Sequence, residues 1–451
     1  MPLSRRSRRS HLARCLVFLI LWGLPGPLVE ACPAQEAAPS YPGQSQPTVV
    51  SALGPQLVRV VALVRHGVRA PTQSAETLAL WSQQPWPDWP VRRAHLTARG
   101  GHLVEAMWVA LRRGWSAYGL WPVNGPPAPG SIFVRADSDQ RTRGTARAIL
   151  RGLGHTQGYA VSDAPRDPLF HPAKAGLHVF TEVERSSVAA RLARLRQELA
   201  GPLQTLASIS GPPAPELCVQ YGRAPGCSLA ELPDRLRITD DGHSLELTGG
   251  LGIASGMAEI FLLEFVQWPG QDVGWGKVDR RLLQTVLPLH GRVFNALNRA
   301  APVALARGAA LLAEMGSALL AEHYDARCNA AALTVFVGHD TNLATVGGLL
   351  GFDWQLPGWP SDSIPPGSAL LLELWQMPEG REVRLRFASL PLEVLHRPLN
   401  EATARLGLAP LVGAGPRYTE QDFAALYRRV TAGGPRAPQD ILPLRPQPVP
   451  R

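Results

Sequence analysis

The sequence predicts an α/β protein with a central, mostly parallel sheet flanked by helices and an inserted, mainly α-helical domain. Three short apolar runs, at Leu57–Val64, Ser131–Val134 and Leu333–Val337, each lead into a polar loop and then a helical pattern. Buried apolar runs that alternate with helices are typical of parallel strands covered on both faces. Between about residues 180 and 325 the apolar residues instead recur three or four positions apart, which indicates helices.

The first 31 residues have the pattern of a secretory signal peptide. A basic start is followed by an apolar stretch, Cys15–Leu24, and by small residues that end at Ala31. The apolar stretch is too short to span a membrane. The pattern at Ser7–Leu12 leaves Tat export open beside Sec export, and Cys32 leaves lipidation open. We therefore expect a periplasmic or secreted protein with no stable membrane insertion.

The two ends of the mature chain differ in composition from its centre. Residues 32–54 and 434–451 are rich in proline, which predicts a flexible leader and a disordered Pro/Arg tail. Between them we expect an α/β core at residues 55–172 and 328–433 and a mainly α-helical insert domain at residues 173–327. A loop between helices of the insert is expected at Trp268–Lys277.

The charge balance favours an anionic ligand. The chain has 45 basic and 36 acidic residues, and only Lys174 and Lys277 among the basic residues are lysines. Such a uniform bias toward arginine reflects genome composition, so most arginines are expected on the solvated surface. Removal of residues 1–31 leaves 40 basic and 35 acidic residues, a formal charge of +5, which suits an anionic small-molecule substrate. The basic tail has too few charges and too much proline to predict a nucleic-acid partner.

The cysteines are consistent with export. Cys218 and Cys227 lie nine positions apart in a segment rich in proline and glycine, which suits a small disulfide-closed loop in an oxidising compartment. Cys32 and Cys328 could pair with each other or remain free. No cysteine spacing resembles a zinc site.

Charged side chains follow each of the three predicted strands. They are Arg65, His66 and Arg69 after the first, Arg141 after the second, and His339 and Asp340 after the third. Ligands of open α/β sheets bind at the carboxyl ends of the strands, so these six side chains are expected at one edge. Arginine binds phosphate oxygens in bidentate geometry, and a helix N-terminus adds backbone donors. The sequence therefore predicts a phosphoryl-binding site.

The chemistry of this site follows from its residue types. A neutral imidazole beside arginines can attack phosphorus and form a phosphohistidine with no metal and no cofactor. We assign this role to His66, and we assign to Asp340 the proton that the leaving alkoxide needs. A mildly acidic working pH is expected. Either motif alone has a structural interpretation, as a turn or a helix N-cap, but the two together at strand ends favour catalysis.

Two motifs carry a resemblance to a known family. "RHGVRAPT" (Arg65–Thr72) and "GHDTNLA" (Gly338–Ala344) resemble the paired signatures of the histidine acid phosphatases, the large branch of the histidine phosphatase superfamily. Further segments resemble the bacterial periplasmic phytases, in order Asp167–Pro172, Leu247–Glu264, Gly274–Lys277, Leu287–His290 and Pro365–Gly367. The resemblance extends from about residue 55 to 425. It implies a phosphoglycerate-mutase-like core, acid phosphomonoester hydrolysis and a monomer.

The resemblance also implies roles for single residues. His66 would be the nucleophile, Asp340 the proton donor, and Arg65, Arg69, Arg141 and His339 the phosphoryl ligands. Thr72, Asp137, Glu259, Arg307 and Thr341 would contact the substrate, and Cys218–Cys227 matches a family disulfide. For Glu259 and Arg307 the alternative is a charge pair on a helix surface. Gln73 stands where the family has a lysine, so one contact to a peripheral phosphate would be lost.

Several other functions compete with a phytase. A phosphoglycerate-mutase-like enzyme shares Arg-His-Gly but would lack His-Asp-Thr-Asn and an export signal. A catalytically silent phosphate-binding protein would lack His66, Arg141 or Asp340, and all three are present. A metal on His66 and His339 is opposed by the surrounding positive charge. Within the family, a glucose-1-phosphatase or a broad-specificity acid phosphatase remains the alternative to a phytase.

Overall fold

A computed structural model describes residues 54–155, 158–164, 166–436 and 444–448. The expected signal peptide, the leader up to residue 53 and Cys32 lie outside these residues.

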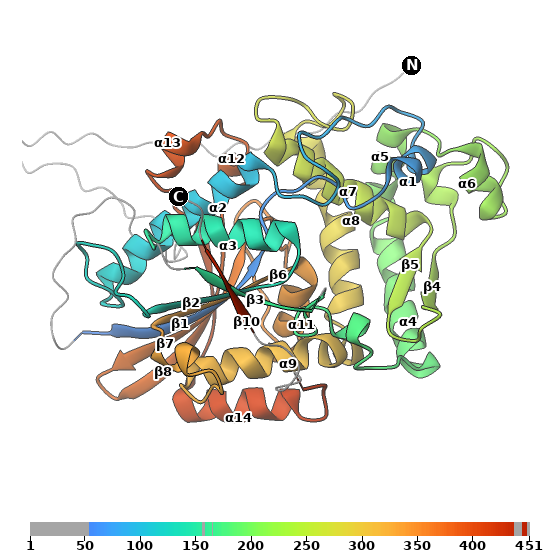
Figure 1. The fold of residues 1–451 in the computed structure, drawn as a ribbon. Coiled ribbons are helices and arrows are strands. Elements are labelled where there is room, and N and C mark those ends of the chain that lie inside the picture. Colours follow the sequence, from blue (N-terminus) through green and yellow to red (C-terminus); the bar gives the residue numbers. More distant parts are fainter. Residues whose placement is uncertain (1–53, 156–157, 165, 437–443, 449–451) are drawn as a thin grey trace, which may run out of the picture. The chain divides into compact units, whose positions relative to one another are not determined.

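A sheet of eight strands forms the centre of the fold, in the order β10-β3-β2-β6-β1-β7-β8-β9 (Figure 1). Its strands are β1 (Gln56–Arg65), β2 (Ile132–Ala136), β3 (Tyr159–Ser162), β6 (Leu333–Gly338), β7 (Ala369–Met377), β8 (Gly380–Ser389), β9 (Leu411–Thr419) and β10 (Leu444–Gln447). The three strands predicted from the sequence are β1, β2 and β6. They lie side by side in parallel, so their carboxyl ends share one edge.

The sheet is mixed rather than mostly parallel, which corrects the expectation from the sequence. Among the described strands, β1 and β2 each pair in parallel with β6, and β2 with β3, whereas the other four pairings are antiparallel. β7, β8 and β9 follow one another as antiparallel neighbours. A two-residue turn joins β7 to β8 and forces that reversal, whereas the longer segment 390–410 joins β8 to β9. β10 pairs with β3, so the expected disorder of the tail is wrong for residues 444–447.

Helices cover both faces of the sheet. The helices that lie wholly or mostly outside the expected insert are α1 (Ala75–Trp81), α2 (Ala98–Ala117), α3 (Gln140–Gly152), α10 (Ala326–Ala330), α11 (Asp340–Leu350), α12 (Leu392–Leu395), α13 (Glu401–Ala404) and α14 (Glu420–Thr431). Figure 1 shows α2 and α3 on one face, with α11, α14 and α9 (Ala301–Leu319) on the other. The residues of β1 from Val60 to Val64 are fully buried between them, as their unbroken apolar run predicts.

The middle of the chain is mainly helical, as expected. Besides α9 it contains α4 (Glu182–Glu198), α5 (Ala200–Ser210), α6 (Pro215–Gln220), α7 (Gly250–Gln267), α8 (Arg280–Asn298), the short 3-10 turns η1 (Pro172–Ala175) and η2 (Leu229–Glu231), and a hairpin of β4 (Arg235–Ile238) and β5 (Leu245–Thr248). The predicted loop Trp268–Lys277 joins α7 to α8. α7 is long and apolar enough to cross a membrane, but 78% of it is buried in the protein, as in a core helix.

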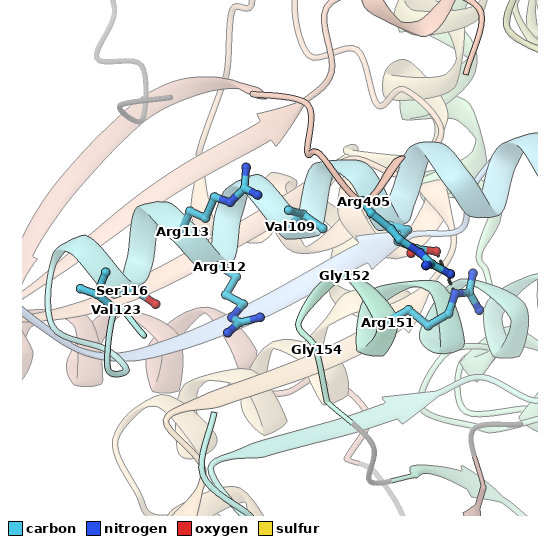
Figure 2. Close-up of a pocket in the computed structure, with 10 residues that line it drawn as sticks. Val109, Arg112, Arg113, Ser116, Val123, Arg151, Gly152, Gly154 and Arg405 are labelled. Carbon is cyan, nitrogen blue, oxygen red and sulfur yellow. Dashed lines mark hydrogen bonds and ion pairs between the residues drawn. The ribbon is translucent and has the colours of Figure 1, made fainter. Parts of the chain in front are cut away.

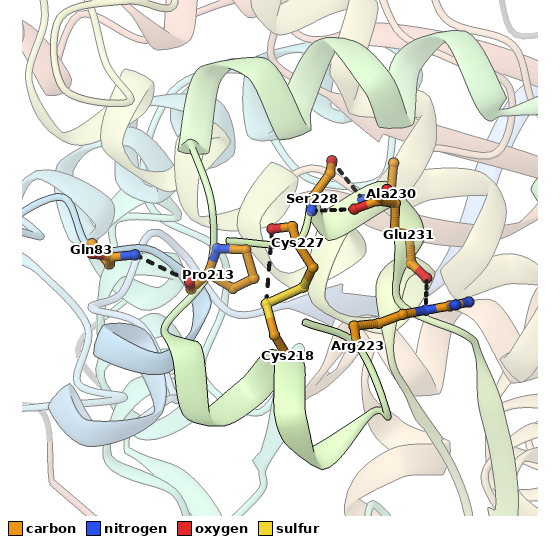
Figure 3. Close-up of a disulfide and its surroundings, with 8 residues drawn as sticks. All are labelled: Gln83, Pro213, Cys218, Arg223, Cys227, Ser228, Ala230 and Glu231. Atoms are coloured by element: carbon orange, nitrogen blue, oxygen red, sulfur yellow. Dashed lines mark hydrogen bonds between the residues drawn. A yellow bond between two sulfur atoms is a disulfide. The ribbon is translucent and has the colours of Figure 1, made fainter. Parts of the chain in front are cut away.

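The disulfide implied by the family resemblance is present. Cys218 in α6 is joined to Cys227, and the bridge closes a small loop beside η2 (Figure 3). The next turn is ordered by a capping box, in which Ser228 and Glu231 exchange side-chain and backbone hydrogen bonds. Among the described residues Cys328 has no disulfide partner, and its thiol is fully buried. Burial raises its pKa to about 12, so it is a poor nucleophile.

Reduction of the disulfide should lower stability without changing the chemistry. Closing a loop of this length restricts the unfolded chain and contributes roughly 2–3 kcal/mol to the free energy of unfolding. We expect a reductant to lower the Tm by several degrees while kcat at a permissive temperature is unchanged. A variant with both Cys218→Ser and Cys227→Ser should have a Tm that no longer responds to reductant. A response that persists in this variant would point to another thiol.

Glu264 on α7 is a carboxyl group in a buried position. The residue is 3% exposed, and its Oε2 accepts a hydrogen bond from the backbone N–H of Gly274 at 3.0 Å. Burial raises the pKa of Glu264 from 4.5 to about 7, and the hydrogen bond from Gly274 opposes this only in part. The group is therefore neutral at mildly acidic pH and ionised above pH 7.

This carboxyl group should make the protein less stable as the pH rises. The folded protein keeps the proton of Glu264 up to about pH 7, whereas the unfolded chain releases it near pH 4.5. The stabilisation by this protonated group is therefore complete below pH 4.5 and is lost as the pH rises toward 7. The loss amounts to about 3 kcal/mol at about 1.4 kcal/mol per pKa unit. In urea unfolding, Glu264→Gln should match the wild type at pH 4 and be more stable at pH 8. The control, Glu379→Gln in the exposed turn between β7 and β8, should leave the stability unchanged at both pH values. An equal effect of Glu264→Gln at pH 4 and pH 8 would contradict the prediction.

Candidate active site

The loop after β1 carries the first motif into the protein interior. Arg65 is fully buried and His66 is 2% exposed. Gly67 lets this loop rest on α2, because a Cβ atom there would lie 2.7 Å from the carbonyl oxygen of Gly100. The backbone N–H of Gly67 donates to Thr145 Oγ1 of α3 at 3.0 Å. The loop is thus fixed by two helices on the same face of the sheet.

His66 is held in one tautomer. Its Nδ1 lies 2.9 Å from the carbonyl oxygen of Gly67, which can only accept, so Nδ1 carries the proton and Nε2 keeps its lone pair. Burial, followed by the charges of Arg141 and Arg69, lowers the pKa of His66 well below its usual value. The imidazole therefore remains a neutral base at acidic pH.

The loop between β6 and α11 places His339 and Asp340 opposite the first motif. The backbone N–H of His339 donates to Asn342 Oδ1 at 2.9 Å, and this contact begins α11. Asp340 Oδ2 lies 3.0 Å from Arg65 NH2, and its Oδ1 accepts from the backbone N–H of Thr341 at 2.8 Å. The rings of His66 and His339 are 5.5 Å apart. The second motif therefore meets the first, as the sequence predicts.

The loop between β2 and α3 completes the cluster. Arg141 lies in the first turn of α3, and its NH2 is 2.6 Å from Asp139 Oδ2 and 3.3 Å from His339 Nδ1. Asp137 is fully buried, and its Oδ2 is 2.8 Å from His339 Nε2. Because α3 and α11 both begin here, their positive N-terminal ends also face the cluster. The site is arranged to bind an anion.

Glu259 on α7 binds the arginines of the first motif. Its Oε1 lies 2.5 Å from Arg65 NH2 and 3.1 Å from Arg69 NH2. Burial would raise the pKa of Glu259, but the charges of Arg69, His290 and Arg65 outweigh it and hold that pKa at about 2. Glu259 is thus an ionised partner that holds both guanidinium groups in place.

Arg307 on α9 is not paired with Glu259, so the surface charge pair considered above is wrong. Its NH2 donates to Ser244 Oγ at 3.1 Å, its NH1 donates to Asn298 Oδ1 at 3.4 Å, and its guanidinium lies over the ring of Phe180 at 5.9 Å. These contacts orient the guanidinium and leave its charge available to an anion.

The remaining predicted residues lie within the two motifs or directly after them along the chain. Thr72 is exposed and its hydroxyl lies 3.5 Å from Gln73 Oε1, while Thr341 is half-buried in the first turn of α11. The amide nitrogen of Gln73 would lie 3.7 Å from a Cβ atom at Gly256, one helical turn before Glu259. Gln73 therefore packs against the segment of α7 that carries Glu259.

Sequence reasoning assigned no role to Asp139, His171 or His290, which the structure brings to the cluster. His171 Nε2 lies 3.0 Å from Asp137 Oδ2, and its ring is 4.9 Å from that of His339. His290 Nδ1 lies 3.4 Å from Ser255 Oγ, and its charge acts on Glu259. The resemblance contained both histidines, in "DPLFHP" and "LPLH", but nothing in either motif indicates a contact.

Four of these residues have the donor types of a metal site. Asp137, Asp139, His171 and His339 each place one ligand atom within 4.8 Å of the others. However, Asp137 Oδ2 already accepts from both imidazoles, and the guanidinium of Arg141 lies against Asp139. This positive charge opposes a cation, so the geometry favours a hydrogen-bond network.

A cavity beside α2 and α3 is lined by several arginines (Figure 2). It has a volume of about 310 Å³, and its charged lining residues are Glu105, Arg112, Arg113, Arg151 and Arg405. It lies toward the C-terminal ends of both helices, where cationic side chains complement the negative end of the helix dipole. Arg151 is also paired with Glu105 at 2.8 Å. Arg112 and Arg113 donate to the carbonyl oxygens of Gly125 and Leu406, and Arg405 is paired with Glu401, so each arginine of the cavity has a structural partner.

Comparison with known proteins identifies the family. The profile of the histidine phosphatase superfamily (branch 2) matches residues 56–196 and 278–388. The chain belongs to this superfamily. Both matched ranges contain the clustered motifs, and the gap between them falls in the helical middle of the chain. The protein is a phosphomonoester hydrolase of the histidine acid phosphatase type.

The relatives with similar sequences include a phytase and a glucose-1-phosphatase. The histidine phosphatase is 35% identical over 341 residues to Phytase AppA of Escherichia coli (strain K12), over 71% of this chain and 77% of that protein. It is 26% identical over 334 residues to Glucose-1-phosphatase of Salmonella typhimurium, over 71% of this chain and 78% of that protein.

Solved structures agree with the sequence comparison. The apo form of Hafnia alvei phytase superposes with a TM-score of 0.74 at 31% identity, over 84% of this chain and 98% of that chain. The structure of the Hafnia alvei phytase in complex with myo-inositol hexakis sulphate superposes with a TM-score of 0.72.

Proposed function

We propose that this histidine phosphatase is a secreted acid phosphatase that hydrolyses phytate through a phosphohistidine at His66. The observation that carries the proposal is the state of His66, whose Nδ1–H is tied to Gly67 and whose Nε2 lone pair is kept unprotonated beside Arg69 and Arg141. The similarity to phytases supports the substrate. The Cys218–Cys227 disulfide supports an oxidising compartment.

In the first step, His66 Nε2 attacks phosphorus and the bond from phosphorus to the ester oxygen breaks. Arg65, Arg69, Arg141 and His339 neutralise the equatorial oxygens of the transferred group, while protonated Asp340 gives its proton to the departing alkoxide. The products are a phosphohistidine, a free alcohol and an Asp340 carboxylate.

In the second step, water attacks the phosphohistidine and Asp340 accepts a proton from it. The phosphorus–nitrogen bond breaks, orthophosphate leaves, and neutral His66 is restored. The proton that Asp340 lost in the first step is thereby returned. Each half-reaction needs only residues that the structure brings together, and a metal has no role in either.

Phytate requires contacts beyond the reacting phosphate. Only one of its phosphates can occupy the arginine cluster at a time, so the others must meet the surrounding residues. We propose that Thr72, Thr341 and the free charge of Arg307 serve this purpose. The helical segment 173–327, which we propose to be an insert domain, supplies Glu259 and Arg307. At Gln73 a neutral amide stands where a lysine would add a charge-assisted contact.

Gln73→Lys should therefore improve the specificity constant for phytate. A charge-assisted hydrogen bond is worth about 1.5–3 kcal/mol when fully made and less at a solvated rim, so we expect a gain of about three- to tenfold. Gln73 is half-buried and borders a cavity of about 490 Å³, which leaves room for the longer side chain. The measurement is kcat/KM for phytate and for 4-nitrophenyl phosphate, and the gain should be confined to phytate. Equal gains for both esters would show that residue 73 acts on the reacting phosphate.

A panel of phosphomonoesters at acidic pH tests the proposed substrate. Phytate, glucose 1-phosphate and 4-nitrophenyl phosphate should all be cleaved, with modest discrimination between phytate and the simple ester. If glucose 1-phosphate is cleaved and phytate is not, the phytase proposal fails and the protein is a sugar phosphatase. The neutral Gln73 is the observation that keeps this second candidate open.

A further inference from the structure

One oxygen of a buried carboxylate is the hydrogen-bond partner of two imidazoles beside the arginine cluster. Asp137 Oδ2 lies 2.8 Å from His339 Nε2 and 3.0 Å from His171 Nε2. Asp137 is fully buried, and among the described residues its other oxygen, Oδ1, has no hydrogen-bond partner. The orientation of this carboxylate therefore depends on the two imidazoles.

The turn that carries His171 is held in place by contacts with β2 and α11. Asp167 is fully buried, and both its carboxylate oxygens accept from Arg135 of β2, at 2.9 to 3.2 Å. The backbone N–H of His171 donates to the carbonyl oxygen of Asp167 at 2.9 Å. Asn342 Nδ2 of α11 donates to the carbonyl oxygen of Phe170 at 3.0 Å. His171 is thus fixed to the strand that leads to Asp137 and to the helix that follows His339.

This support has a consequence for His339. With Nε2–H directed at Asp137, the opposite ring nitrogen of His339, Nδ1, faces Arg141 and the site proposed for the phosphoryl group. If Asp137 turned, the ring of His339 would turn with it. Outer hydrogen-bond partners of this kind set the direction and basicity of a functional imidazole.

We propose that His171 is a positioning residue of this phosphatase, which holds the Asp137 carboxylate so that His339 is aimed at the phosphoryl group. The inference rests on the proposed role of His339 as a phosphoryl ligand. It assigns to His171 two separable effects. One is geometric, through the hydrogen bond to Asp137. The other is electrostatic, because the two imidazoles share the charge of a single carboxylate.

The electrostatic effect has a definite direction. The groups that contact the two imidazoles are Asp137, Asp139 and Arg141 from the β2–α3 segment and His66 from the loop after β1. Arg65 of β1, Arg69 and Asp340 of α11 lie behind them and act on His66 or Arg141. Burial lowers the pKa of His339, and Arg141 and His171 lower it further, against the stabilising effect of Asp137. Removal of the imidazole at position 171 should therefore raise the pKa of His339.

Two substitutions separate the geometric effect from the electrostatic one. The amide nitrogen of glutamine reaches about as far as Nε2 of histidine, so His171→Gln can still donate to Asp137 but carries no charge. His171→Leu can do neither. The experiment measures kcat and KM for 4-nitrophenyl phosphate, and the inhibition constant of inorganic phosphate, from pH 3 to pH 8. His95→Gln, whose imidazole contacts the carbonyl oxygen of Arg93, is the control.

We expect phosphate inhibition to persist to higher pH in both variants, because His339 keeps its proton longer. We expect kcat to fall about tenfold in His171→Leu and to stay within about threefold of the wild type in His171→Gln. His95→Gln should match the wild type throughout.

The inference is overturned if His171→Gln has the wild-type pH dependence of phosphate inhibition, or if both variants lose kcat equally. Since His171→Gln preserves the hydrogen bond, it remains informative even if His171→Leu folds poorly. His66→Ala, assayed in parallel, tests the proposed function by itself. Turnover in His66→Ala would overturn the phosphohistidine mechanism. If His66→Ala is inactive and the two variants at position 171 behave like the wild type, only the role of His171 is overturned.

Discussion

His66→Ala is expected to abolish turnover of every phosphomonoester while the protein still folds. Removal of a nucleophile costs at least about 10⁴-fold in kcat, because the remaining groups can only bind and polarise the substrate. Arg65, Arg69 and Arg141 remain, so the variant should still bind inorganic phosphate. Rapid quenching during turnover should trap an acid-labile phosphoenzyme in the wild type and none in His66→Ala.

The low pKa of His66 sets the pH range of this chemistry. Because burial and two arginines keep Nε2 unprotonated well below pH 6.5, the acid limb of kcat/KM should lie far below the usual pKa of histidine. His95→Ala, whose imidazole contacts the carbonyl oxygen of Arg93, is the matched control and should keep full activity. A phosphoenzyme in His66→Ala, or label on another residue of the wild type, would show that the nucleophile lies elsewhere.

The parallel half of the sheet could be predicted from the sequence, and the antiparallel half could not. β1, β2 and β6 are short apolar runs that end in motifs, so both their burial and their direction followed from one pattern. β7 is equally apolar, and nothing within Ala369–Met377 indicates that it runs the other way. The sequence signal for antiparallel pairing was the two-residue connection at Pro378 and Glu379, which requires β7 and β8 to be antiparallel to each other. It leaves the direction of β7 beside β1 open.

The tail shows a different limit of sequence reasoning. Its proline content predicts disorder, yet Leu444–Gln447 pairs with β3 at the edge of the sheet. Proline lacks an N–H group, but an edge strand has one side without a neighbour, so Pro446 can be accepted there. Whether such a segment pairs depends on whether a strand edge is free, which is a property of the whole fold.

The candidate site divides in the same way. Arg65, His66, His339 and Asp340 were predictable because their positions at strand ends bring them together in any sheet of this order. The contacts that orient them were not. Glu259 reaches Arg65 across 194 residues of sequence, and its helix had to be packed before the contact was visible. The motif that contains His171 did not indicate a role for this residue. The turn sets the direction of the His171 side chain, and the turn itself is held by contacts with Arg135 and Asn342.

This division has a physical basis. A side chain that follows a strand is placed by the backbone, and the backbone pattern is local in sequence. A side chain that supports another is placed by packing, which depends on residues from several segments. The reactive side chains of the site are therefore predictable from the sequence, whereas the contacts that support them appear only in the folded structure. These contacts determine how precisely the reactive side chains are oriented.

Asp340→Asn should slow hydrolysis in proportion to how poorly the leaving group departs. Asp340 begins α11, and its contacts with Arg65 NH2 and the N–H of Thr341 direct the carboxyl group at the ester oxygen in the proposed mechanism. An alkoxide needs a proton as it leaves, so kcat for phytate or another alkyl phosphate should fall about 10²- to 10⁴-fold. The phenolate from 4-nitrophenyl phosphate leaves without one, and its release should slow only a few-fold. Asp353→Asn, an exposed carboxylate paired with Arg299, is the control and should leave both rates unchanged. Equal losses for the two kinds of ester would show that Asp340 acts by binding the phosphoryl group and that another acid protonates the leaving oxygen.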